Sequence, residues 1–497
     1  MEPRLPPLEH PGAPPPRTGR ALALILLGGT AARLLLAAVV PLGNDEAYYV
    51  DWARHLQAGY LDHPPAVAWL IALPLRLAGS SALSVRLPAL LLQLLTMVLA
   101  ASLARARGGE RAALLLTVAL QAAPVFSVGA ALITPDAPLA LAWVGTLWAL
   151  QRALDRDGRW ALAAGAFLGL GALSKLTAGL LGLAVLAALA GTPDGRRLLA
   201  RPWPWLGALL AAAIGSPMLL WNAARGWPSF AFQASHGLGG GGVSLGRLLA
   251  STGAQLGYVS PVLLGVTAVA AYRALRGRGD ALRAALAFSA LPVAAFFTLA
   301  AAFTPGALPH WPAPGWLSAL LCAALPGAAI PERWWRRALW VGLGELSVGL
   351  FVLLVLLAVP FPATLSLLGR TVPVRRGPLD DLLGWGEGAA AARAVAGDAR
   401  LATSHWIALG QLGFYDRRSP AYLGERRSGP SLYDPDPLAA GEPLLLVTVD
   451  GLGPQRDRME ERLGPLEPAG AFTARQGERP VRTYRFWWWR GPARPRP

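Results

Sequence analysis

Long apolar runs recur along most of this chain, and they restrict its fold more than any other feature. Between residues 21 and 360 the runs are each on the order of 20 residues, the length that a helix needs to cross the hydrocarbon core of a bilayer. Hydrophobic residues make up 54% of the 497 residues and charged residues 15%, values outside the usual range of soluble domains. The sequence therefore predicts a mainly helical, polytopic membrane protein with about eleven spans.

The arginines indicate how such a chain is oriented. They account for most of the formal net charge of +16, but they lie at the ends of apolar runs and form no stripe beside aromatic residues, which argues against nucleic-acid binding. If Arg17 and Arg20 are cytoplasmic, counting spans puts the later arginine clusters on the same side, near residues 105–111, 152–159, 196–201, 273–278 and 333–337. We expect a disordered cytoplasmic tail (1–20), a membrane domain (21–360) and an extracytoplasmic C-terminus.

The count of eleven depends on one tight turn. Residues 161–173 and 177–189 must be two spans joined outside the membrane at Ser174 and Lys175. Residues 21–42 are longer than a signal-peptide core and lack a convincing cleavage site, so we expect a retained first helix. Residues 66–78 are too short and too close to Arg76 to span comfortably, which favours an interfacial helix in the first outside loop.

The composition changes after residue 371, where acidic residues return and apolar runs shorten to strand length. Residues 380–396 predict a helix, and residues 400–404, 443–449 and 481–487 predict strands. We expect a small extracytoplasmic α/β domain at 371–497. The one cysteine, Cys322, sits inside an apolar run and rules out a disulfide framework.

The first outside loop carries acidic residues at the membrane edge, Asp45 and Glu46 followed by Asp62. Carboxylates beside hydrocarbon have a raised proton affinity and serve as general bases or metal ligands. For Asp45 or Glu46 alone, capping the N-terminus of a helix is an equal alternative. The presence of Asp62 in the same loop, and of Asp136 at the end of the next outside loop, favours a functional site.

Lys175 is the only lysine in the chain. Its ammonium at the outer membrane edge suits a lipid phosphate, although a lysine that merely extends toward the headgroups is an equal alternative. Arg225 and Arg247 also lie outside, against the positive-inside trend, and they indicate an anionic ligand.

Five of the six histidines fall in the outside segments, among them His63, His236 and His310. Exclusion of polar side chains from lipid explains much of this bias. Residues 237–242, nearly all glycine, are either a loop that closes over substrate or a plain flexible connector.

Five separated motifs resemble, in order, the bacterial glycosyltransferase family 39. They are Asn44-Asp45-Glu46-Ala47-Tyr48-Tyr49, Gly59-Tyr60-Leu61-Asp62-His63-Pro64-Pro65, Thr134-Pro135-Asp136-Ala137-Pro138, Leu173-Ser174-Lys175 and Trp221-Asn222. That family consists of GT-C fold enzymes related to protein O-mannosyltransferases and to the lipid A aminoarabinose transferase. The resemblance extends from about Leu42 to His310, and Gln411 to Tyr415 also resembles the soluble tail of the family.

The resemblance implies transfer of a sugar, with inversion, from a polyprenyl-phosphate carrier to an acceptor outside the bacterial plasma membrane. The acceptor would be a glycolipid such as lipid A, a polysaccharide or a protein. Asp45 is then the candidate base, supported by Glu46 and Asp136. Four basic side chains are candidates to bind the donor phosphate: Lys175, Arg225, Arg247 and His63.

A metal ion is a further implication of the resemblance. The aminoarabinose transferases have an acidic residue and a lysine before the proline pair, where this chain has Asp62 and His63. In those relatives a metal joins the acidic residue to a histidine of a later loop, and the matching positions here are Asp62 and His236, which suit zinc or a similar divalent ion. No nucleotide cofactor is expected, because the chain has no Gly-rich phosphate loop between a strand and a helix.

A non-enzymatic flippase or permease for lipid-linked sugars is the alternative function. It would also use outward-facing basic residues, but it predicts a polar path through the bundle and related internal repeats. The polar residues of this sequence are confined to one face of the membrane, which favours the transferase.

Overall fold

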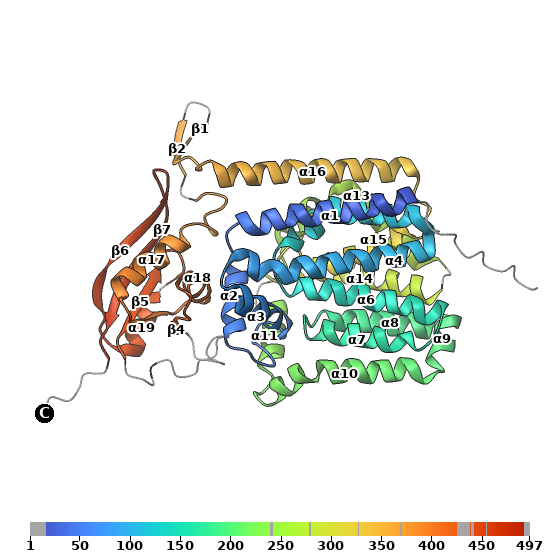
Figure 1. Ribbon diagram of the computed structural model, residues 1–497, viewed down its shortest axis with the longest axis horizontal. Helices are drawn as coiled ribbons and strands as arrows, with labels where there is room; N and C mark the ends of the chain where they lie inside the picture. The colour runs from blue at the N-terminus through green and yellow to red at the C-terminus, as the bar shows by residue number, and fades with distance from the viewer. Residues whose placement is uncertain are drawn as a thin grey trace, which may run out of the picture.

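In the computed structural model, the described residues are 16–238, 242–277, 280–326, 328–367, 370–374, 376–424, 438, 442–453 and 455–491. Long helices run side by side in a bundle, and a sheet with its own helices lies at one end of that bundle (Figure 1). The bundle is formed by α1 (Pro16–Val39), α4 (Ala82–Ala122), α6 (Asp136–Asp155), α7 (Trp160–Ala172), α8 (Ala178–Gly191), α10 (Pro202–Ala223), α12 (Leu245–Val259), α13 (Pro261–Arg276), α14 (Ala281–Ala300), α15 (Ala313–Ala324) and α16 (Glu332–Ala358).

Shorter helices connect these long ones. They are α2 (Asn44–Arg54), α3 (Ala66–Ala78), α5 (Pro124–Ser127), the 3-10 turn η1 (Gly129–Ala131), α9 (Pro193–Leu199) and α11 (Pro228–Leu238). The helix α3 has the bounds expected for the helix of the first outside loop. The helices α7 and α8 lie on either side of the tight turn at Ser174 and Lys175, where the Ala66 amide donates to the Leu173 carbonyl (2.9 Å).

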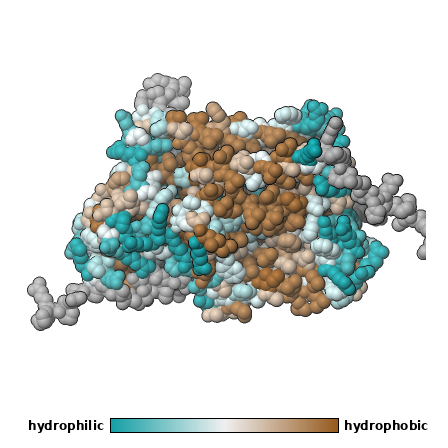
Figure 2. All heavy atoms as spheres, viewed as in Figure 1, coloured by the Kyte–Doolittle hydropathy of each residue, from teal (hydrophilic) through white to brown (hydrophobic). Residues whose placement is uncertain are grey.

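On the face seen in Figure 2, an apolar belt crosses the bundle between two more polar ends. Large apolar side chains such as Leu27, Leu220 and Phe351 are exposed on it, as expected of a surface that faces lipid. Five described helices are long and apolar enough to cross a membrane, or up to seven if each of two bent helix pairs is one span. The chain is therefore a multi-pass membrane protein. A count of eleven spans would also require α6, α7, α15 and the part of α4 after Gly109 to cross the membrane. The count of eleven therefore stays a prediction.

The helix α4 is two helices joined at Gly109, whose φ of 72° is accessible to glycine at little cost. Just before this turn, Arg107 pairs with Asp155 (2.6 Å) at the end of α6 and with Asp280 ahead of α14. The arginine-rich turn therefore ties three helix ends together.

The C-terminal unit follows α16. A hairpin of β1 (Thr364–Leu367) and β2 (Arg370–Pro373) comes first, and then a five-stranded sheet in the order β4-β3-β5-β7-β6. Its strands are β3 (Arg400–Thr403), β4 (Ala421–Tyr422), β5 (Leu444–Val449), β6 (Glu467–Gln476) and β7 (Arg479–Trp489). The strand β3 pairs in parallel with β4 and β5, and β7 pairs antiparallel with β5 and β6.

Helices cover both faces of this sheet. The helices α17 (Trp385–Ala396) and α18 (Trp406–Asp416) pack with Leu445 and Tyr484, while α19 (Gln455–Leu463) packs its Met459 against Leu444 on the opposite face. The expected helix at 380–396 begins only at Trp385. Asp380 instead pairs with Arg479 (2.6 Å), and Gly384 has a φ of 81° that interrupts the helix before it starts.

One buried ion pair joins the segments at the end of the bundle that meets the C-terminal unit. Glu46 and Arg86 are 2% and 1% exposed and are linked by two hydrogen bonds of 2.8 and 2.5 Å. The Glu46 carboxylate also accepts from the amides of Gly43 (3.0 Å) and Ile133 (3.1 Å). Arg86 donates to three carbonyls where α1 ends, those of Ala37, Val40 and Pro41. All charges of the pair are thus met by hydrogen bonds.

The C-terminal unit docks on α2 through α18. Gln411 is fully buried and donates to the Leu42 carbonyl (3.1 Å) and to Asn44 Oδ1 (3.0 Å). Arg54 donates to the Gly413 carbonyl (2.7 Å). Gly410 lies flush on α2, because a Cβ atom there would sit 2.6 Å from the backbone nitrogen of Tyr48. These contacts make α2 and α18 one rigid piece.

Removing Arg86 should destabilise the protein strongly. Arg86→Ala leaves the Glu46 charge buried without its partner, which costs about 3–5 kcal/mol of unfolding free energy. Thermal unfolding in detergent measures this loss. The matched control is Arg111→Ala, which removes a pair with Glu332 whose side chains are 68% and 66% exposed, and it should change stability by less than about 1 kcal/mol. Equal effects of the two substitutions would contradict the role given to Arg86.

Candidate functional site

A cavity of about 1220 Å³ lies where the bundle meets the C-terminal unit. It is lined by α2, by the loop between α2 and α3, by the first turns of α6 and α8, by α11, by the last turns of α14 with the loop that follows, and by α18 and β4. Its polar and aromatic lining includes Asp45, Tyr48, Tyr49, Asp62, His63, Thr134, Asp136, Lys175, Gln233, His310, Trp311, Trp406 and Tyr422. Segments more than 350 residues apart in the sequence therefore share one site.

Asp136 and Lys175 form an ion pair in the wall of this cavity. The Lys175 Nζ atom lies 2.8 and 3.0 Å from the two carboxylate oxygens of Asp136, and both side chains are mostly buried. His310 Nε2 lies 3.7 Å from the same carboxylate. Burial lowers the pKa of His310 despite the neighbouring Asp136, so this imidazole is neutral at pH 7.

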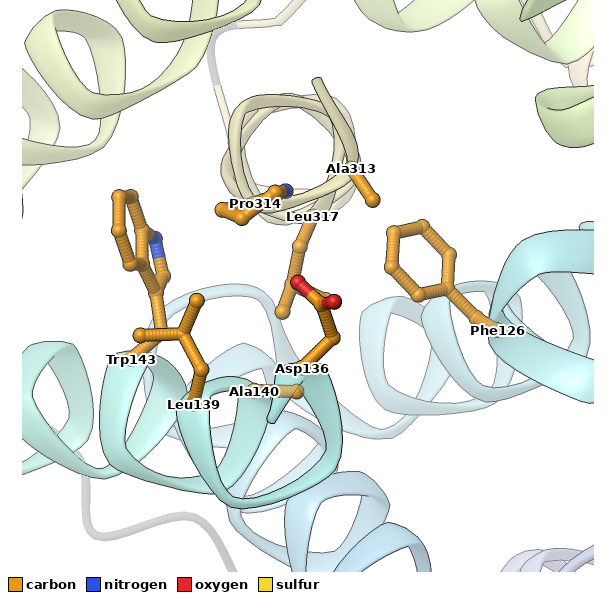
Figure 3. A pocket seen from close by; sticks show the side chains of 8 residues that line it. All are labelled: Phe126, Asp136, Leu139, Ala140, Trp143, Ala313, Pro314 and Leu317. Atoms are coloured by element: carbon orange, nitrogen blue, oxygen red, sulfur yellow. The ribbon is translucent and has the colours of Figure 1, made fainter. Parts of the chain in front are cut away.

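The other side of Asp136 is apolar. A small pocket of about 30 Å³ beside its carboxylate is lined mainly by apolar side chains, among them Phe126, Trp143 and Leu317 (Figure 3). A carboxylate on such a surface has few groups that stabilise its charge, so Lys175 is needed as the counter-charge. Only the N–H groups of Lys175 that do not bond to Asp136 are available to a ligand in the cavity.

Asp45 and Asp62 are the two further carboxylates that line the cavity. Asp45, at the first turn of α2, is exposed to the cavity, and no hydrogen bond of its side chain is seen among the described residues. Burial and the adjacent Glu46 raise the pKa of Asp45 above its usual value. Asp62 accepts a hydrogen bond from the Tyr48 hydroxyl (3.2 Å), and its backbone carbonyl accepts from Gln233 (2.5 Å). Burial raises the pKa of Asp62 to about 6, against the effect of the Tyr48 hydrogen bond.

One end of the cavity is apolar and reaches the molecular surface. Its walls are Leu176 just before α8, Leu180 within α8, Phe232 of α11, Phe296, Phe297 and Leu299 of α14, and Phe303 in the loop that follows. Phe296, Leu299 and Phe303 are also about half exposed, so they belong both to the cavity and to the apolar belt. A lipid chain fits such a surface.

The structure places the remaining candidate residues away from the cavity wall. Glu46 is engaged in the buried ion pair with Arg86. Arg225 is exposed and lies over the Trp221 ring, 4.6 Å from its centre. Arg247 donates to the carbonyls of Ala302 (2.8 Å) and Gly242. The positive-inside trend locates a charge along the membrane normal, but it says nothing about the direction in which a side chain points.

The metal hypothesis gains no support from the described residues. Among them, no group of three or more His, Cys, Asp or Glu side chains is close enough to hold a metal ion. Asp62 lines the cavity, but the side chain of His236 in α11 lies outside the described part of the chain, as do residues 239–241 of the glycine run.

Sequence patterns missed several lining residues. His310 was noted only as one of many outside histidines, yet it contacts Asp136. Trp406 and Tyr422 come from the C-terminal unit, and no periodicity or spacing connects them to the first outside loop. The Thr-Pro-Asp segment at 134–136 is a usable signal, because Pro135 directly precedes a helix and leaves Asp136 in its first turn.

The bundle and the attached sheet have the GT-C fold of ArnT. A family profile for dolichyl-phosphate-mannose-protein mannosyltransferases matches residues 62–221. A structure of ArnT from Cupriavidus metallidurans bound to undecaprenyl phosphate is similar at a TM-score of 0.62 with 18% identity, covering 94% of this chain and 98% of that one. The apo structure of the same protein gives a TM-score of 0.63 over the same shares. At that identity the likeness shows the fold alone.

A curated relative adds to this match. The lipid A galacturonosyltransferase RgtD of Rhizobium johnstonii is 30% identical over 303 residues, which are 58% of this chain and 60% of the relative. The match thus spans about three fifths of the length of RgtD. The profile, the relative and the fold all agree with the resemblance to the GT-C glycosyltransferases that the sequence motifs indicate.

Proposed function

We propose that this protein transfers a sugar from a polyprenyl-phosphate donor to a glycolipid acceptor such as lipid A, outside the bacterial inner membrane. One observation carries the proposal: a single cavity contains an exposed carboxylate, a lysine ammonium and an apolar end that reaches the lipid-facing surface. Two similar proteins support the same proposal, since ArnT was solved with undecaprenyl phosphate and RgtD is a lipid A galacturonosyltransferase.

In the proposed reaction Asp45 accepts the proton of an acceptor hydroxyl. The hydroxyl oxygen then forms a bond to the anomeric carbon of the donor sugar, and the bond from that carbon to the phosphate oxygen breaks. The phosphate leaves with the electron pair, and Lys175 and His63 stabilise its charge. Attack opposite to the departing phosphate gives inversion. No step requires a nucleotide or a metal ion.

Other residues of the site act on this chemistry indirectly. Glu46 holds the first turn of α2, where Asp45 lies, and Asp136 holds Lys175 through the ion pair of 2.8 Å. Arg225 and Arg247 are not part of the proposed phosphate site, because neither lines the cavity. A cytoplasmic N-terminus and an extracytoplasmic unit at 371–497 are the topology that this proposal requires.

Replacing Asp45 tests the base directly. Asp45→Asn should lower transfer from a radiolabelled polyprenyl-phosphate sugar to lipid A by about 10²–10⁴-fold, since a positioned base contributes that much. Asp450→Asn, a change at an exposed residue of the C-terminal unit that pairs with Arg485, should leave transfer unchanged. Full transfer by Asp45→Asn would refute the assignment of the base. Movement of the lipid-linked sugar across vesicles without any transfer by the wild type would favour the flippase.

Replacing Lys175 tests the phosphate contact. Lys175→Ala combined with Asp136→Asn leaves no unpaired buried charge, and it should raise the KM for the donor about 10–100-fold through loss of a charged hydrogen bond. The control is Arg376→Ala, which removes a 71% exposed cation of the C-terminal unit. An unchanged donor KM in the double variant would indicate a lysine that only extends toward the headgroups.

The acid side of the pH profile should report Asp45. Because burial and Glu46 raise its pKa, lowering the pH protonates Asp45 and removes the base at a pH above the ordinary aspartate value of about 3.9. The quantity kcat/KM should therefore fall on the acid side earlier than it would with a solvated aspartate, and this decline should be absent from the residual activity of Asp45→Asn. The same acid decline in both proteins would assign it to another group.

A further inference from the structure

Two aromatic side chains of the C-terminal unit reach into the cavity, Trp406 and Tyr422. Trp406 is the first residue of α18, where His405 caps the helix by accepting from the Ile407 amide (3.2 Å). Tyr422 is the last residue of β4. Each element thus presents its end to the cavity, and the C-terminal unit forms part of the wall.

These two residues extend an aromatic cluster that starts on α2. The Trp406 ring centre is 5.2 Å from that of Tyr48, which in turn lies 5.0 Å from Trp52 in an edge-to-face arrangement. Trp52 stacks on Tyr60 at 4.3 Å. Tyr48 is also fixed by its hydrogen bond to Asp62 (3.2 Å). The aromatic end of the cavity is therefore rigid, and it has both flat apolar faces and hydrogen-bonding groups.

The chemistry of this end differs from that of the rest of the cavity. Lys175 and the apolar residues of α8 and α14 suit a phosphate and a lipid chain, whereas Tyr48 of the aromatic cluster donates to the Asp62 carboxylate (3.2 Å) and lies one helical turn from Asp45 on α2. A carboxylate repels phosphate but accepts hydrogen bonds from hydroxyl groups. An aromatic face packs against the carbon-bound hydrogens of a sugar ring, as amphipathic aromatic residues commonly do at binding sites. The combination suits a saccharide.

We propose that Trp406, Tyr422 and Tyr48 form the subsite for the saccharide of the acceptor, so that the C-terminal unit selects the acceptor. This inference rests on the proposed transfer reaction. Asp45 lies on α2 beside Tyr48, so an acceptor sugar on the aromatic faces brings its hydroxyl to the base, while the donor approaches from the end of Lys175. The docking of α18 on α2 through Gln411 and Gly410 fixes the distance between this subsite and the base.

Kinetics of a Trp406 variant test the subsite. With the full chain in detergent, Trp406→Ala should raise the KM for lipid A by roughly ten-fold, which corresponds to about 1.4 kcal/mol, and leave the KM for the polyprenyl-phosphate sugar within about two-fold. Trp406→Phe, which keeps a flat ring, should recover most of the affinity. The matched control Trp488→Ala removes another half-buried tryptophan of the same unit that does not line the cavity, and it should change neither KM.

The possible results separate this inference from the proposed function. A higher KM for the donor with an unchanged KM for lipid A would overturn the assignment to the acceptor. Should Trp406→Ala unfold, as judged by its melting temperature, Trp406→Phe and Tyr422→Leu provide the same comparison. Absence of transfer by the wild type would count against the proposed function instead. In that case saturation-transfer NMR with the free glucosamine disaccharide of lipid A decides, and a signal identical in wild type and Trp406 variants would refute the subsite.

Discussion

The buried ion pair of Glu46 and Arg86 is the constraint on which the end of the bundle beside the C-terminal unit depends. The Glu46 carboxylate accepts hydrogen bonds from the amides of Gly43, at the start of α2, and of Ile133. The Arg86 guanidinium donates to a carbonyl at the end of α1. Asp45 lies two residues beyond Gly43, and Asp136 lies three residues beyond Ile133. A buried charge is costly unless all of its partners are in place, so small displacements of either loop are strongly opposed.

Much of the membrane part follows from local pattern. The apolar runs predict the helices of the bundle, and the helix at Ala66–Ala78 and the turn at Lys175 lie where the sequence puts them, because length and hydrophobicity are local properties. The strands β4 and β6 are not predicted, because β4 is only two residues long and most residues of β6 have little strand preference, so that tertiary pairing decides their state.

The candidate site was only half predictable for a similar reason. Asp45, Asp62, His63, Asp136 and Lys175 all line the cavity, and each lies in a motif at an expected loop. Arg225, Arg247 and Glu46 were equally suitable by charge and position, yet each is directed elsewhere, toward a ring, a carbonyl or a neighbouring arginine. The sequence shows the charge of a residue and the loop in which it lies. The direction of its side chain is decided only when the helices pack.

Gly410 sets how far the C-terminal unit stands from the bundle. No methyl group fits between it and the backbone of Tyr48, so the two surfaces are as close as polypeptide allows. Because Trp406 is on the same helix, this closeness also fixes the width of the cavity mouth. In a related chain with a larger residue at this position, the C-terminal unit would lie farther from α2. The residue at position 410 would then limit the size of the acceptor through the width of the cavity, although it does not contact the acceptor.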